Sequence, residues 1–187
     1  LLAVISGAVV IVVDGMEGGT GATQECFFVH VGIPTMPAVR MAAEALKELG
    51  MHREGVQLIV SGGIRSGADV AKAIALGADA VSIGTAALIA LGDNNPELEE
   101  EYNKLGTTAG FYDEWQAGDD PAGITTQDEK LAARLDPKKG GEKLANYLKV
   151  LTLEAQTLAR ACGKSHIRNL EPEDLNALTL EASAMAK

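Results

Sequence analysis

The sequence predicts an α/β fold with a parallel sheet, and three observations carry this prediction. Apolar residues are almost continuous over 8–13, 56–60 and 80–83, as in parallel strands that are buried on both faces. Each run ends in a glycine-rich turn. Helical patterns follow the runs, and such alternation is typical of right-handed βαβ units.

Helices are expected after each predicted strand. Residues 37–49 place apolar side chains along one face and end at Gly50, while the alanine-rich run 68–76 ends at Gly77. A shorter helix is expected over 86–91. The second and third strands start 24 residues apart. This spacing favours a compact barrel-type repeat, and an open doubly wound sheet is the other arrangement that fits.

The pattern changes after Gly92. A helix is expected over 96–105, followed by turn-forming residues. Residues 141–161 have the apolar stripe of a long amphipathic helix. A last helix is expected over 171–184, where Pro172 suits the first turn.

The charge excludes two classes of partner. The 187 residues carry a formal net charge of −10, and 12 Asp or Glu against three Lys or Arg lie between Asp93 and Asp136. An acidic balance argues against binding nucleic acid or an anionic membrane surface, since both require an excess of Lys and Arg. Two distant cysteines and no secretory signal predict a cytoplasmic protein.

Two loops have the composition of an anion site. Ser61, Gly62 and Gly63 follow a predicted strand and precede Arg65, so backbone N–H groups and a fixed charge can face an anion. The next strand ends at Gly84 and Thr85. Two such consecutive loops match the phosphate cup of (β/α)₈ barrels, although tight turns without a ligand remain an alternative.

A third loop, over 14–22, holds four glycines in seven residues. This density indicates either backbone lying against a ligand or positive φ angles, and a flexible surface loop is the alternative. Asp14 and Glu17 are candidate acids, bases or hydrogen-bond acceptors. The glycine spacing does not fit the dinucleotide-binding pattern G-x-G-x-x-G.

The segments DGMEGGTGA, SGGIRSGADVAKAIALGADAVSIGTAALIALG and PAGITTQDEKLAARLDP resemble the FMN-binding barrel domain of the glutamate synthase family. The resemblance implies the C-terminal portion of a (β/α)₈ TIM barrel with additional C-terminal helices. The earlier strands would lie upstream, so we expect isolated 1–187 to bind FMN poorly.

The resemblance also implies roles for individual residues. Those implied to bind the cofactor are Ser61, Gly62, Gly63, Arg65, Gly84 and Thr85. Those implied to form the substrate-side loop are Asp14, Gly18, Gly19, Thr20 and Gly21, with Glu17 as the candidate catalytic residue.

The chain departs from the family pattern at its cysteines. Family enzymes hold an iron–sulfur cluster through a cysteine after the ALG segment and two more before the P-A-G-I run. Here Asp93 follows the first motif, Asp120 precedes the second, and no cysteine lies between Cys26 and Cys162. We therefore expect no metal site and no iron–sulfur cluster. The expected parts are 1–92 as barrel, 93–136 as an acidic insertion replacing the cysteine segment, and 137–187 as C-terminal helices.

Because it lacks these cysteines, the chain resembles a branch of the family that has no iron–sulfur cluster, the N-methylglutamate synthases. The resemblance implies an FMN-dependent subunit that forms glutamate or N-methylglutamate by amine transfer through a 2-iminoglutarate-like intermediate. Its substrates would be glutamate, 2-oxoglutarate and ammonia or methylamine, and its partners amidotransferase-like and glycine-repeat β-helix subunits. The alternatives are a non-catalytic barrel subunit of such a complex, or an unrelated FMN or phosphate-binding barrel oxidoreductase.

Overall fold

The computed structural model describes residues 1–18, 25–107 and 117–185. They divide into two compact units, each described by itself. The sheet unit comprises 1–18, 25–83 and 150–185, and the acidic unit comprises 84–107 and 117–149. No helix in the described residues combines the length and apolar character needed to cross a bilayer.

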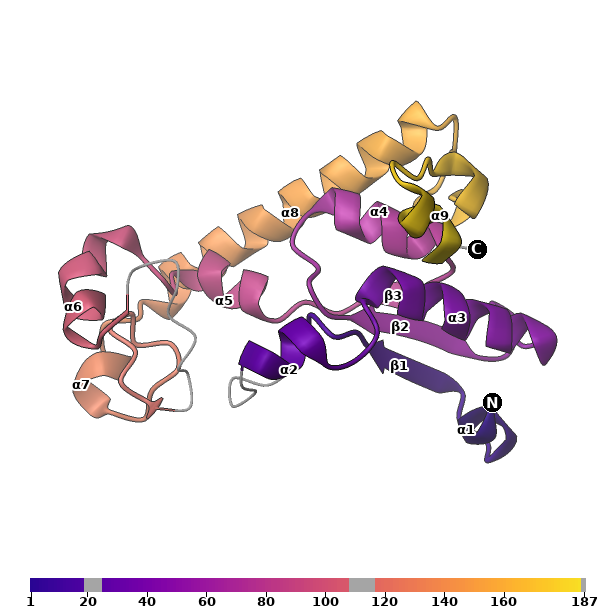
Figure 1. The fold of residues 1–187 in the computed structure, drawn as a ribbon. Coiled ribbons are helices and arrows are strands. Elements are labelled where there is room, and N and C mark those ends of the chain that lie inside the picture. Colours follow the sequence, from indigo (N-terminus) through magenta and orange to yellow (C-terminus); the bar gives the residue numbers. More distant parts are fainter. Residues whose placement is uncertain (19–24, 108–116, 186–187) are drawn as a thin grey trace. The chain divides into compact units, whose positions relative to one another are not determined.

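Three parallel strands form the sheet, as the sequence predicts. They are β1 (Val10–Asp14), β2 (Gln57–Ser61) and β3 (Ala80–Val81), in the order β1-β2-β3. The register pairs Asp14 with Ser61. The last residues of β1 and β2 therefore lie side by side at the carboxyl edge of the sheet (Figure 1).

The core of the sheet unit lies between the sheet and the helices on one of its faces. Leu58 and Val60 of β2 are completely buried. They belong to one hydrophobic cluster with α3 (Thr35–Glu48), α4 (Gly67–Ala75) and the C-terminal half of α8 (Pro137–Ala161). The apolar periodicity of these helices thus forms the core that the sequence predicts.

The opposite face of the sheet is not covered in the same way. Val10 and Val12 of β1 are 45% and 61% exposed. Val12 pairs with Ile59, which in turn pairs with Ala80, so these three residues share that face. The expectation that each strand is buried on both faces is therefore wrong for β1, because helices pack on one side only within the described residues.

The starts of α4 and α8 are set by local capping. Ser66 and Asp69 form a reciprocal capping box at the start of α4. The long helix α8 begins at Pro137 rather than at the expected residue 141. The reason is Asp136, whose Oδ1 accepts the N–H groups of Lys138 at 3.0 Å and Lys139 at 3.2 Å.

The C-terminal segment is the largest departure from the expected helices. In place of one helix over 171–184, there is a 3₁₀ turn, η4 (Pro172–Asp174), and then α9 (Leu180–Met185). Glu171 and Asp174 cap the turn reciprocally, and Leu175 has an extended backbone that ends it. Four further short elements within the described residues were not expected: α1 (Leu2–Ile5), α2 (Glu25–His30), α7 (Glu129–Ala132) and η3 (Ile167–Asn169).

The acidic unit consists of short helices and turns together with the start of α8. Its elements are α5 (Thr85–Leu91), η1 (Pro96–Leu98), α6 (Glu99–Lys104) and α7 (Glu129–Ala132). The helix expected over 96–105 is thus a 3₁₀ turn followed by an α-helix. The side chain of Tyr102 is completely buried in this unit.

Candidate functional site

The candidate site lies at the carboxyl ends of β1 and β2, and we call residues 14–18 and 61–65 the glycine-loop edge. Ser61 Oγ donates a hydrogen bond to Asp14 Oδ1 at 2.5 Å. The Gly15 N–H donates to the carbonyl oxygen of Ser61 at 3.0 Å. Because side chain and backbone both join the two strand ends, the loops that follow start from fixed positions.

Glycine is required in these loops by conformation and by packing. Gly62 and Gly63 have φ angles of +106° and +68°, which L side chains rarely adopt. A Cβ on Gly62 would lie 2.6 Å from Thr35 Oγ1, and one on Gly63 would lie 3.0 Å from Glu17 Cβ. These glycines therefore let the two loops pack against each other.

The loop after β2 offers hydrogen-bond donors. No acceptor in the described part of the chain takes the N–H groups of Gly62, Gly63 or Ile64. The exposed Arg65 follows directly. Successive N–H groups in a turn that contains positive φ angles form a concave anion site, and a guanidinium adds a charge suited to phosphate or carboxylate. The geometry therefore fits an anionic group, such as the phosphate of a cofactor.

The N-terminus of α4 is already occupied by protein carboxylates. Asp69 Oδ2 accepts the N–H groups of Arg65 at 3.1 Å and Ser66 at 3.2 Å. Glu154 of α8 accepts the Gly67 N–H at 2.7 Å. These carboxylates neutralise the positive end of the helix dipole locally. An anionic ligand would therefore bind to the three N–H groups that precede the helix.

Glu17 is held by the start of α3. Its Oε2 accepts a hydrogen bond from Thr35 N at 2.7 Å and from Thr35 Oγ1 at 2.6 Å. Partial burial acts to raise the pKa of Glu17, but the Thr35 hydrogen bonds and the charge of Arg65 outweigh it and lower the pKa. Glu17 is therefore ionised at neutral pH, which suits a hydrogen-bond acceptor better than a proton donor.

The other predicted residues are placed as follows. The Gly18 N–H closes a turn onto the Gly15 carbonyl at 2.9 Å, and a Cβ on Gly18 would collide with the Asp14 carboxylate. Gly84 and Thr85 belong to the acidic unit, where they begin α5 and are exposed. The predicted residues Gly19, Thr20 and Gly21 lie outside the described residues.

The acidic unit contains a second polar arrangement, the acidic-unit cluster of Asp93, Asn94, Tyr102 and Asp120. All four are buried. Asp120 accepts hydrogen bonds from Tyr102 Oη at 3.2 Å and from the N–H groups of Ala122, Ile124 and Thr125 at 2.9 to 3.1 Å. The Asn94 N–H donates to Asp93 Oδ1 at 2.8 Å and to Tyr102 Oη at 3.0 Å.

The same cluster explains the ionisation of its tyrosine. Burial raises the pKa of Tyr102, and the carboxylates of Asp120 and Asp93 raise it further. The phenol therefore remains protonated and serves as a hydrogen-bond donor. The Asp120 carboxylate has its charge compensated by four donors, as a buried charge requires.

These carboxylates stand where the resemblance places cysteines. Asp93 follows the ALG segment and Asp120 precedes Pro121. Iron–sulfur clusters are held by thiolates, and this cluster presents carboxylate and phenol oxygens that are already hydrogen-bonded. In the described ranges, no group of three or more His, Cys, Asp or Glu is arranged to hold a metal ion. The donor set does not fit an iron–sulfur cluster.

Sequence reasoning did not identify Thr35, Glu154 and Tyr102. Thr35 is 2% exposed and binds a carboxylate 18 residues away, while Glu154 caps a helix 87 residues away. Such long-range partners leave no periodicity in the sequence. For Glu154, the available signal was a charged residue beside the apolar stripe of a predicted helix.

Known proteins match this chain over most of its length. The family model for the conserved region in glutamate synthase matches residues 2–96 and 116–165. A glutamate synthase large subunit-like protein of Rhizobium meliloti is 70% identical over 186 residues, which is 100% of this chain and 42% of the relative. An archaeal glutamate synthase [NADPH] of Methanocaldococcus jannaschii is 42% identical over 165 residues, which is 88% of this chain and 29% of the relative.

A ferredoxin-dependent chloroplastic glutamate synthase of Oryza sativa is 33% identical over 152 residues, which is 81% of this chain and 8% of the relative. The chain spans less than half the length of these curated relatives. The family model covers both loops of the glycine-loop edge and both ends of the acidic segment. The chain belongs to the glutamate synthase family.

Proposed function

We propose that this chain is part of an FMN-dependent enzyme subunit that transfers an amine to form glutamate or N-methylglutamate. The observation that carries the proposal is the set of available N–H groups at Gly62, Gly63 and Ile64 beside Arg65. Family membership favours this function over an unrelated barrel oxidoreductase.

The sheet supports a partial barrel. In a (β/α)₈ barrel, helices cover the outer face of the strands and apolar side chains of the inner face fill the interior. Here the helices pack on one face, while Val10 and Val12 are exposed on the other. We propose that this uncovered face belongs to the barrel interior, with 1–92 as barrel and 137–187 as its C-terminal helices.

The proposed roles at the glycine-loop edge follow from its geometry. The N–H groups of Gly62, Gly63 and Ile64, with Arg65, would hold the cofactor phosphate, and Ser61 would fix the loop to Asp14. When bound, FMN supplies hydride transfer. For Gly84 and Thr85, the proposed cofactor role rests on the resemblance alone.

The role of Glu17 follows from its contacts. Its carboxylate is bound by Thr35, so we assign it as a positioning residue that holds the loop after β1 against α3. We still propose that this loop, from Asp14 to Gly21, lies on the substrate side of the flavin.

The acidic-unit cluster supports assignment of the chain to the branch of the family that lacks the iron–sulfur cluster. Exchange of ammonia for methylamine on glutamate leaves the oxidation state of the carbon skeleton unchanged, so it needs no net electron input. The residues at the positions expected for cysteine are hydrogen-bonded carboxylates. The family match omits residues 97–115, which supports the central part of the proposed acidic insertion over 93–136. The proposed partners remain amidotransferase-like and glycine-repeat β-helix subunits.

The test is an assay of the full-length protein in complex with its partner subunits. We expect N-methylglutamate to form from glutamate and methylamine without added reductant, as measured by mass spectrometry of the products. Activity only with 2-oxoglutarate and a reductant would contradict the exchange reaction. Absence of flavin from the active complex would contradict the FMN proposal. A complex fully active without this subunit would identify it as the non-catalytic alternative.

A further inference from the structure

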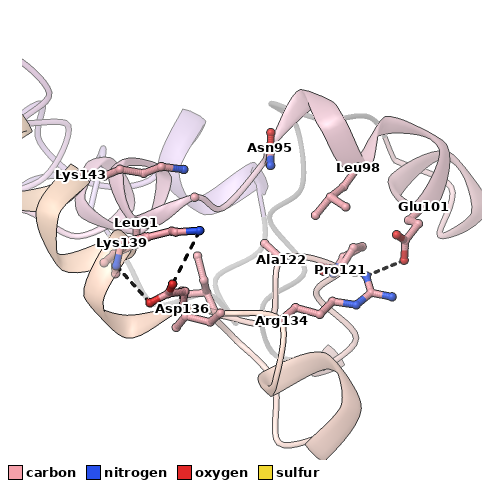
Figure 2. Close-up of a pocket in the computed structure, with 14 residues that line it drawn as sticks. Leu91, Asn95, Leu98, Glu101, Pro121, Ala122, Arg134, Asp136, Lys139 and Lys143 are labelled. Atoms are coloured by element: carbon pink, nitrogen blue, oxygen red, sulfur yellow. Dashed lines mark hydrogen bonds and ion pairs between the residues drawn. The ribbon is translucent and has the colours of Figure 1, made fainter.

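The acidic unit contains a cavity of about 450 Å³ that the proposed function does not use (Figure 2). We call it the lysine cavity. Its walls come from the end of α5, from η1 and α6, from the segment around Pro121 and from the start of α8. The volume lies within the range of small-molecule sites, which is roughly 300 to 1,000 Å³.

Two solvent-exposed lysine side chains line this cavity. Lys139 and Lys143 are one turn apart on α8, so their side chains lie on one face of the helix. Figure 2 shows both extending from α8 toward the side where Asn95 and Ala122 lie. The Lys139 Nζ is 3.9 Å from Asp136 Oδ2, in a solvent-exposed pair. Within the described part of the chain, the Lys143 ammonium has no hydrogen-bond or ion-pair partner.

The carboxylates that line the cavity are committed elsewhere. Glu101 accepts a hydrogen bond from Arg134 Nη1 at 2.7 Å (Figure 2). The same nitrogen donates to the Pro121 carbonyl at 2.9 Å. Asp136 caps α8 through two N–H groups. The lining therefore carries three cationic side chains against two carboxylates, and Lys143 is the cation that no carboxylate of the described residues pairs with.

The rest of the lining is largely apolar. Leu91, Leu98, Ile124 and Leu135 contribute hydrocarbon surface, and the amide of Asn95 adds a neutral donor and acceptor. Apolar walls give no advantage to a bare inorganic anion, whose whole surface is charged. They suit a ligand that carries a short carbon chain between its charged groups.

We propose that the lysine cavity binds a short dicarboxylate. Each carboxylate would accept a charge-assisted hydrogen bond from one of the two ammonium groups, and the carbon chain would lie against the leucines. Lysine Cβ atoms one turn apart are separated by about 5 to 6 Å, which is comparable to the length of such a chain. The site is separate in the sequence from the glycine-loop edge, so this proposal does not depend on flavin binding.

The test is isothermal titration calorimetry with glutarate as the probe and full-length protein in the cell. We expect saturable binding to the wild type. The Lys143→Ala variant should bind on the order of tenfold more weakly, and the double variant with Lys139→Ala should show no measurable binding. Lys149→Ala is the matched control, since it removes an exposed lysine of α8 outside the cavity and should leave the affinity unchanged.

Other ligands and one further variant make the outcome decisive. Inorganic phosphate and butyrate should bind far more weakly than glutarate, because one lacks the carbon chain and the other lacks the second charge. Equal binding of either would overturn the proposal. So would a Lys143→Ala variant with wild-type affinity, or no glutarate binding to the wild type. Glutarate binding lost in Arg65→Ala but kept in Lys143→Ala would place the ligand at the glycine-loop edge and also overturn it.

Discussion

The glycine-loop edge and the acidic-unit cluster use the same kinds of groups to opposite effect. At the glycine-loop edge, three successive N–H groups have no acceptor within the described residues. In the acidic-unit cluster, three N–H groups and a phenol converge on the single carboxylate of Asp120. The first arrangement has unused binding capacity, and the second has used its capacity internally.

This difference separates binding from stability within one chain. A buried donor without an acceptor costs free energy unless water or a ligand takes it, whereas a satisfied network stabilises its own fold. Changes at the glycine-loop edge should therefore reduce cofactor affinity most. Changes in the acidic-unit cluster should reduce local stability and leave cofactor affinity nearly unchanged.

The largest expected effect is that of Asp120→Ala. It leaves three buried N–H groups and Tyr102 Oη without their acceptor, so the acidic unit should lose about 3 kcal/mol of local stability. Hydrogen exchange at residues 122–125 should accelerate by about 100-fold. The control is Glu100→Ala, which removes an exposed acid of α6. Equal exchange in both variants would show that the network does not stabilise the unit.

The next effect is that of Gly62→Ala. The new Cβ would lie 2.6 Å from Thr35 Oγ1 at a φ of +106°, so the loop must shift, at a cost of about 2 kcal/mol. Flavin affinity of the full-length protein should fall at least about tenfold, measured by fluorescence titration. Gly141→Ala is the matched control, because no atom lies within 4 Å of its Cβ. It should stabilise α8 slightly and leave flavin affinity unchanged.

Glu154→Gln should have a smaller effect. It keeps an acceptor for the Gly67 N–H but removes the charge that faces the positive end of α4. We expect a loss of about 1 kcal/mol, seen as a lower midpoint in thermal unfolding. Gln156→Ala, at an exposed position of the same helix, is the control. A midpoint lowered equally by both changes would argue against a specific role for the carboxylate.

The smallest effect is the pH dependence contributed by Glu17. Because the pKa of Glu17 is lowered in the folded state, its ionised form stabilises the fold. This contribution is present at neutral pH and is lost as the pH falls from about 4.3 through the folded pKa. Glu17→Gln should thus cost about 0.5 kcal/mol at pH 7 and less at acidic pH, measured by urea unfolding. A deficit independent of pH would contradict this assignment.

The sequence predicts those features that depend on neighbouring residues. The three strands follow from continuous apolar runs, and α4 follows from its capping residues and alanine-rich face. The exposed face of β1 was not predicted, because an apolar run does not reveal which of its faces another segment covers. The prediction of one helix over 171–184 was wrong. The side chain of Asp174 accepts the Glu171 N–H and caps a short turn there, so no continuous helix forms.

The candidate site divides in the same way. Its loops and glycines are visible in the sequence, because glycine clusters directly after apolar runs are local signals. The partners that hold them, Thr35 and Glu154, come from distant positions, and only the fold brings them together. The assignment of Glu17 as a positioning residue therefore needed the structure.

The most direct test of the central claim is the flavin content of the full-length protein after gel filtration, compared between the wild type and Arg65→Ala. We predict near-stoichiometric flavin in the wild type and strong depletion in Arg65→Ala. The Asp120→Ala protein should retain flavin, because its cluster serves stability. A wild type without flavin, or an Arg65→Ala protein that keeps all of it, would contradict the assignment of the glycine-loop edge as the cofactor site.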